Sequence, residues 1–176
     1  DGFVSRGLGD VYKRQRLGAH RLVHNDFTPN FKQTLQPLLD ENNSNPSRIS
    51  VFNLWRRFDK DGVDAPFALC DSRTVSEKEL IPTDLFNYGK QEENTETLAD
   101  ENGFTVEIYQ SMNSDDHQWY FYPKMNREEV VMFKTYDSNE KPFMPTLHSA
   151  FDDAVHAREG ATPRESIEVR AICFYD

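Results

Sequence analysis

The strict alternation of the last segment, PRESIEVRAICFY at residues 163–175, constrains the fold more than any other feature of the sequence. Successive residues alternate between two faces, and a period of two indicates a β-strand. One face holds Glu165, Ile167, Val169 and Ala171, and the other holds Arg164, Ser166, Glu168 and Arg170. An arginine buried on the polar face would need an anionic partner, because an unpaired buried charge is costly.

Short segments rich in β-branched and aromatic residues recur along the chain, with turn signals about every ten residues. Strands are expected within residues 20–27, 48–58, 65–75, 103–110, 117–123, 130–137 and 145–153. Leucines at helical spacing predict a short helix within residues 29–42, although Pro37 argues against a long one. The pattern therefore predicts an all-β fold with minor helices, arranged as a sandwich or jelly roll.

Composition supports a folded, β-rich body and excludes several classes of protein. Thirteen Phe, seven Tyr and two Trp supply bulky core material. The formal net charge of -10 argues against a nucleic-acid partner, and no apolar run has the roughly 20 residues that a membrane span needs. Cys70 and Cys173 lie in apolar contexts, so we expect buried thiols of a cytoplasmic protein rather than a disulfide. Nothing in the sequence specifies an oligomeric state.

The first fifteen residues, DGFVSRGLGDVYKRQ, show neither a structural period nor a helix cap. They resemble a translated sequencing-adapter remnant, so we expect a non-native tail over residues 1–15. Residues 16–176 are then expected to form a single domain that lacks its natural N-terminal part. The stretch at 87–102 holds many acids and little to bury, and is expected to be a solvated loop.

His24 and Asp26, in RLVHNDFTP, would project from the same face of a strand. His148, in PTLHSAF, lies at an expected strand end far along the chain. An early His-x-Asp and a late His on a jelly roll form the pattern of a 2-His-1-carboxylate site, which binds Fe(II) and leaves positions open for oxygen and a cosubstrate. The alternative is an exposed His-Asp pair and an unrelated core histidine.

Arg164 and Ser166 follow His148 at the start of the last strand. A guanidinium fork and a hydroxyl together suit a carboxylate, such as the distal carboxylate of 2-oxoglutarate. Arg170, on the same face, is a rival anchor. Alternatively, Arg164 pairs with a local acid such as Glu165 or Asp152 at the surface.

Taken together, these segments resemble the family of non-haem iron hydroxylase/desaturase proteins that includes AsaB, CmcJ and gibberellin-desaturase-like proteins. The matching segments are RLVHNDFTP, ISVFNLWRRF, APFALCDSRTV, LIPTDLF, HQWYFYPKMNREEVVMFKTYDS, LHSAFDD and PRESIEVRAICF. They follow the family order over nearly everything from Arg16 to the end.

The resemblance implies a double-stranded β-helix and a dioxygenase that uses Fe(II), 2-oxoglutarate and O2. It implies that His24, Asp26 and His148 are the metal ligands. It also implies that Arg164, with Ser166, binds the cosubstrate, and Arg170 remains the second choice. The expected reaction is hydroxylation or desaturation of a small, secondary-metabolite-like molecule.

Other residues and other functions remain open at this point. Asn53, Trp55, Tyr120 and Tyr122 either line a substrate pocket or pack in the core, and His117 is expected to be solvated. Two rival functions also fit the sequence: a non-catalytic jelly-roll module that binds a small molecule, and a cupin-type metal enzyme that needs no 2-oxoglutarate.

Overall fold

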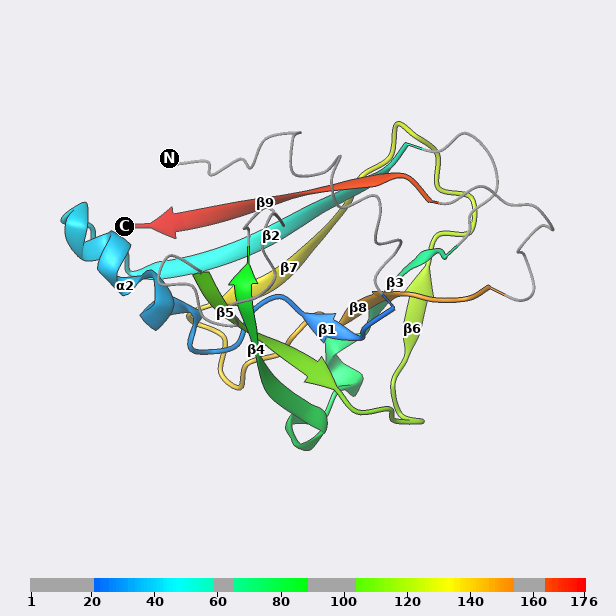
Figure 1. Ribbon diagram of the computed structural model, residues 1–176, viewed down its shortest axis with the longest axis horizontal. Coiled ribbons are helices and arrows are strands. Elements are labelled where there is room, and N and C mark those ends of the chain that lie inside the picture. The colour runs from blue at the N-terminus through cyan, green and yellow to red at the C-terminus, as the bar shows by residue number, and fades with distance from the viewer. Residues whose placement is uncertain (1–20, 59–64, 89–103, 154–163) are drawn as a thin grey trace.

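The computed structural model describes residues 21–58, 65–88, 104–153 and 164–176 (Figure 1). Two sheets dominate it, and every strand pair that these residues form is antiparallel. The all-β fold with minor helices is therefore confirmed, and two facing antiparallel sheets are the arrangement of a jelly roll.

The larger sheet has six strands in the order β4-β5-β1-β8-β3-β6. Their bounds are Leu80–Tyr88 (β4), Phe104–Ser111 (β5), His24–Asn25 (β1), His148–Ala150 (β8), Phe67–Cys70 (β3) and Trp119–Phe121 (β6). The smaller sheet has the order β7-β2-β9, with bounds Val131–Asp137, Arg48–Arg57 and Ser166–Tyr175. The three strands of the smaller sheet run side by side as one layer in Figure 1.

Helical structure is minor. The helix α2 spans Phe31–Glu41 and includes Pro37, so the proline does not end it. The loss of one backbone donor at Pro37 is outweighed by the packing of Phe31, Leu35 and Leu39 on the core. Two 3-10 turns, Ser72–Thr74 (η2) and Glu77–Glu79 (η3), connect β3 to β4.

Several strand predictions hold, and others need correction. The strand expected within residues 20–27 is reduced to His24–Asn25 in the described part of the chain, and the one expected at 65–75 ends at Cys70, where Asp71 begins a turn. The strand β4 was not predicted, because Pro82 interrupts its pattern. Pro82 is tolerated there because β4 is the edge strand of its sheet.

The core has two clusters, one between the smaller sheet and α2 and one between the two sheets. One gathers around Val51 and Tyr136, with Phe27, Leu39 and Ile49. The other gathers around Trp55, Met125 and Phe133, with Phe67, Leu69 and Val131 packed against it. Trp55 stacks on Phe67 with a ring-centroid distance of 4.5 Å and an interplanar angle of 12°. This stack joins the two sheets beside His148.

The remaining expectations divide between tested and untested ones. Cys70 and Cys173 are free thiols, as predicted, with Cys70 buried and Cys173 partly buried. Within the described ranges, no helix combines the length and the apolar character required to span a membrane. The expected tail at residues 1–15 and most of the acidic stretch at 87–102 lie outside the described residues.

Candidate metal centre

Strand pairing brings the early and the late histidine together. In the antiparallel pairing of β1 with β8, His24 lies directly opposite His148. Directly opposite residues share a face of the sheet, and the two imidazole centroids lie 4.4 Å apart. His148 is buried, whereas the His24 side chain keeps 18% of its surface exposed. One side of the pair is therefore closed by protein and the other opens outward.

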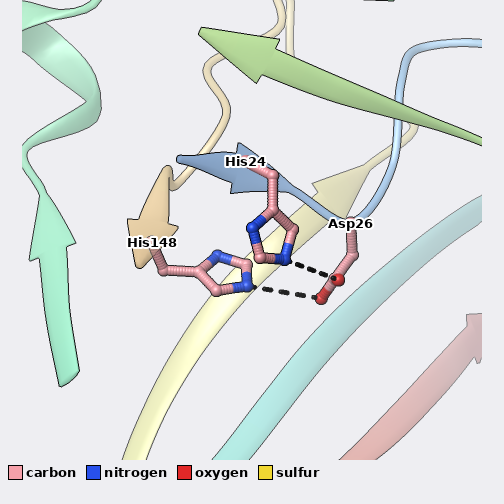
Figure 2. Close-up of side chains that lie close together, drawn as sticks. All are labelled: His24, Asp26 and His148. Atoms are coloured by element: carbon pink, nitrogen blue, oxygen red, sulfur yellow. Dashed lines mark ion pairs between the residues drawn. The ribbon is translucent and has the colours of Figure 1, made fainter. Parts of the chain in front are cut away.

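Asp26 completes the group, two residues after His24 (Figure 2). Its Oδ1 lies 3.8 Å from His24 Nε2, and its Oδ2 lies 3.8 Å from His148 Nε2. The three potential ligand atoms all lie within 4.8 Å of one another. Two imidazoles and one carboxylate at such separations form the donor set of the facial triad that binds non-haem Fe(II).

Backbone carbonyls orient both imidazole rings. His24 Nδ1 lies 2.8 Å from the Leu22 carbonyl oxygen, and His148 Nδ1 lies 3.1 Å from the Thr146 carbonyl oxygen. A ring nitrogen that faces a carbonyl carries the proton, so Nε2 is the ligand nitrogen of each neutral ring. Burial lowers the pKa of both His24 and His148, which favours these neutral rings. Neutral imidazole is the form that binds a metal.

Asp26 is buried and held by two side chains of the smaller sheet. Asn53 Nδ2 donates to Oδ2 at 2.5 Å, while Arg170 donates from Nη2 to Oδ1 at 2.8 Å and from Nε to Oδ2 at 3.2 Å. Burial alone would raise the pKa of Asp26, but Arg170 and then the two histidines lower it, so the net pKa lies well below its usual range. Asp26 is therefore a fixed carboxylate.

Glu168 adds a second acid to this face of β9. Its Oε1 lies 3.0 Å from Arg170 Nη2, and only 23% of its side chain is exposed. Burial, and after it the negative charge of Asp26, raises the pKa of Glu168 to about 7. Sequence reasoning placed Glu168 on the polar face but gave it no role, although its spacing of two from Arg170 was a usable signal.

Arg164 lies two residues before β9, and Ser166 is the first residue of that strand. The Arg164 guanidinium lies 5.2 Å from the Trp55 ring centroid, and its Nη1 donates to the Ala65 carbonyl at 2.7 Å. Ser166 pairs with Arg57 across the β2–β9 ladder. The structure thus brings Arg170, rather than Arg164, into contact with the triad.

The four candidate pocket residues separate into two groups. Asn53 and Trp55 are buried, Asn53 against Asp26 and Trp55 in the core cluster. Tyr120 and Tyr122 are exposed and line an open cleft of about 640 Å³. The same cleft is lined by Phe67, whose ring centroid lies 5.9 Å from that of His148. The triad residues do not line this cleft, and Phe67 lies between it and His148.

His117 does not fit its expected solvated state. Only 3% of its side chain is exposed, and Nε2 lies 2.9 Å from Glu79 Oε2. The same Glu79 oxygen accepts a hydrogen bond from the Ser76 backbone, as the capping-box pattern predicts. His117 is thus a structural partner of the turn that precedes β4.

Comparisons with known proteins agree with this geometry. The family model described as oxidoreductase/YMDC permease-like domain matches residues 5–174. The Fe(II)/2-oxoglutarate-dependent dioxygenase nvfI of Aspergillus novofumigatus is 31% identical over 157 residues, which cover 88% of this chain and 52% of that protein. The hydroxylase/desaturase asaB of Aspergillus flavus is 27% identical over 132 residues, covering 74% of this chain and 57% of that protein.

Among solved structures, the chain resembles the iron and alpha-ketoglutarate-dependent endoperoxidase NvfI, with a TM-score of 0.66 and 27% identity. The match covers 89% of this chain and 54% of that one. The chain thus spans about half the length of the relatives it matches. It belongs to the oxidoreductase/YMDC permease-like domain family, and its relatives include an Fe(II)/2-oxoglutarate-dependent dioxygenase and a hydroxylase/desaturase.

Proposed function

We propose that this chain carries the metal centre of an Fe(II)/2-oxoglutarate-dependent oxygenase that hydroxylates or desaturates a small organic molecule. The observation that carries the proposal is the convergence of His24, Asp26 and His148 within 4.8 Å. The cofactors of the family are Fe(II), 2-oxoglutarate and O2. Bound iron would supply the oxygen activation and C–H oxidation, and the protein supplies binding and orientation.

The residues present fit that metal. Each imidazole would bind through Nε2, because each Nδ1 is engaged by a backbone carbonyl. Asp26 supplies the single negative charge of the ligand set, so an Fe(II) ion there keeps a net positive charge and attracts an anionic chelating cosubstrate. Phe67 and Phe133 pack beside His148, with ring centroids 5.9 and 5.0 Å away, and exclude water from that side.

We assign the distal carboxylate of 2-oxoglutarate to Arg164 and Ser166. Arg170, the rival anchor, is already engaged by Asp26 and Glu168, which favours Arg164. Trp55 and the Ala65 carbonyl fix the position of the Arg164 guanidinium. A positioned fork of this kind binds a carboxylate through two parallel hydrogen bonds.

We assign the organic substrate to the open cleft beside the triad. Its aromatic and aliphatic lining, which includes Phe67, Leu69, Tyr120 and Tyr122, suits a molecule with an apolar skeleton. Phe67 lies between this lining and His148, with ring centroids 5.9 Å apart, so a substrate in the cleft would be one side chain away from the metal ligands. The free thiols of Cys70 and Cys173 fit a reducing compartment such as the cytoplasm.

Anaerobic absorption spectroscopy tests the proposal. Adding Fe(II) and 2-oxoglutarate together should produce the weak visible charge-transfer band of the chelate, and neither component alone should produce it. His148→Ala should abolish the band. His117→Ala is the matched control, because it removes another largely buried histidine that is bound to an acid away from the triad. The control variant should keep the band.

Two outcomes would favour the rival functions. Iron binding without a band on addition of 2-oxoglutarate would indicate a metal enzyme of the cupin type. Failure of the wild-type protein to bind iron would leave a non-catalytic binding module as the better hypothesis.

A further inference from the structure

Asp26 is held from across the barrel by two neighbouring strands. Asn53 on β2 and Arg170 on β9 are cross-strand partners, and both donate to its carboxylate. The histidines come from the opposite sheet, where β1 pairs with β8. Residues of both sheets therefore meet around this carboxylate, and its orientation depends on the smaller sheet as well as on β1.

The two oxygens of Asp26 differ in their surroundings. Oδ2 accepts hydrogen bonds from both Asn53 Nδ2 and Arg170 Nε, at 2.5 and 3.2 Å. Two hydrogen bonds are about what the lone pairs of one carboxylate oxygen accept. Oδ1 accepts from Arg170 Nη2 at 2.8 Å. Each oxygen also lies 3.8 Å from one imidazole Nε2, Oδ1 from that of His24 and Oδ2 from that of His148, so the histidines do not distinguish them. The difference lies in the Asn53 hydrogen bond to Oδ2, which leaves more lone-pair capacity for an ion at Oδ1.

From this asymmetry we propose that Arg170 and Asn53 are positioning residues for the metal centre: they fix Oδ2 of Asp26 so that Oδ1 is presented to the divalent ion. The inference rests on the proposed metal site and gives Arg170 a role other than cosubstrate binding. Hydrogen bonds to ligand side chains commonly raise metal affinity by 10–100-fold.

Glu168 explains how Arg170 can hold Asp26 so close to a site that would bind a cation. A guanidinium next to a divalent ion repels it, and Arg170 alone would cancel the charge of Asp26. The Glu168 carboxylate, 3.0 Å from Arg170 Nη2, offsets part of that positive charge and holds the guanidinium in place. Arg170 is thereby shared between two acids and orients one of them.

If Arg170 positions Asp26, its loss should weaken metal binding; if it only compensates charge, its loss should tighten metal binding. These opposite expectations make the proposal testable. If Arg170 only neutralises Asp26, Arg170→Gln should tighten binding of a divalent cation, because a repelling charge is lost. If Arg170 positions the carboxylate, the same change should weaken binding by about 10–100-fold. Asn53→Ala removes no charge and should also weaken binding by roughly the same factor.

The experiment is a titration of the full chain with Co²⁺, followed by its visible d–d absorption, in the absence of 2-oxoglutarate and substrate. Arg170→Gln, Arg170→Lys and Asn53→Ala are compared with the wild type, and circular dichroism checks the fold of each. The control is Arg48→Gln, which breaks another two-point arginine–aspartate pair, to Asp137, at the far end of β2. It should bind Co²⁺ with wild-type affinity.

The inference is supported if both Arg170 variants and Asn53→Ala bind Co²⁺ more weakly and change the intensity of the d–d bands. It is overturned if Arg170→Gln binds as tightly as the wild type or more tightly. It is also overturned if Asn53→Ala, the milder change, keeps wild-type affinity. A wild-type chain that binds no Co²⁺ would refute the metal site itself, whereas normal Co²⁺ binding without the 2-oxoglutarate band would refute only the proposed reaction.

Discussion

Replacing Asp26 by Asn should separate the structural role of this carboxylate from its proposed role in metal binding. The change keeps the shape of the side chain and removes its charge. Breaking a buried ion pair costs about 3–5 kcal/mol. In Asp26→Asn, Arg170 would still have Glu168 as an anionic partner, 3.0 Å away. We therefore expect the metal-free variant to lose about 3 kcal/mol of folding stability, the low end of that range. For a chain of this size that lowers Tm by about 6–12 °C.

Metal binding adds a second distinction, of similar size. Divalent ion at 100 times its Kd stabilises a folded protein by about 2.7 kcal/mol, which raises the wild-type Tm by about 5–11 °C. Loss of one of three ligands should weaken binding at least 100-fold, more than the loss of a mere ligand-orienting group. The same ion concentration then only equals Kd in Asp26→Asn, and the stabilisation falls to about 0.4 kcal/mol, or about 1 °C.

The assay is thermal unfolding by calorimetry with Co²⁺ or with a chelator, on the wild type and Asp26→Asn. Asp137→Asn is the matched control, since Asp137 is also buried, with 5% of its side chain exposed, and is also held at two points by an arginine. It should lose stability and keep the full Co²⁺ response. If Asp26→Asn shows the wild-type rise in Tm with Co²⁺, the assignment of Asp26 as a ligand is wrong.

Three further predictions follow from single contacts. Arg164→Ala should raise the 2-oxoglutarate concentration needed for half of the anaerobic charge-transfer band by at least tenfold, because a carboxylate–arginine contact contributes about 1.5–3 kcal/mol, and should leave Co²⁺ affinity unchanged. Trp55→Ala should lower the free energy of unfolding by about 3–5 kcal/mol in denaturant titrations, since its ring is buried against Phe67. The hydrogen bonds from Arg48 lower the pKa of Asp137 to about 2. The resulting stabilisation is present above pH 4 and is lost as the pH falls towards 2. In Arg48→Gln, the free energy of unfolding should therefore fall by about 1–2 kcal/mol less than in the wild type over this pH range.

The sequence contained enough information to nominate the triad, but the structure was needed to assemble it. His24 and Asp26 share a face because they are two residues apart, which is a local property of a strand. The position of His148 depends on β8 lying between β1 and β3, where it pairs with both. Nothing in the residues around His148 encodes that choice, since strand order is set by the packing of the whole sandwich.

Side chains that hold the triad were harder to predict than the triad itself. Asn53 was a candidate pocket residue, yet it is fully buried and donates to Asp26. Its contact follows from the register of β2 against β9, which sets Asn53 beside Arg170, and from the approach of the opposite sheet. Register and sheet packing are long-range properties, so a pattern within one strand cannot supply them.

The orientation of β9 shows most clearly how function competes with hydrophobic burial. A rule based on hydrophobicity alone would turn Val169 towards the core and Arg170 towards water. The structure does the reverse: Val169 is 40% exposed, and Arg170 points to buried Asp26. Burying the exposed 40% of Val169 would stabilise the fold by about 0.6–1.2 kcal/mol, so the observed register needs a compensating interaction of at least that size.

Asp26 supplies that interaction. With β9 shifted by one residue, every side chain would change faces, and the buried carboxylate of Asp26 would lose its guanidinium partner. An uncompensated buried charge costs several kcal/mol, and the same shift would also turn Ile172 away from the core cluster on which it packs. The carboxylate that is proposed to bind the metal therefore helps to turn the polar face of β9 inward. The partial exposure of Val169 is a consequence of that register.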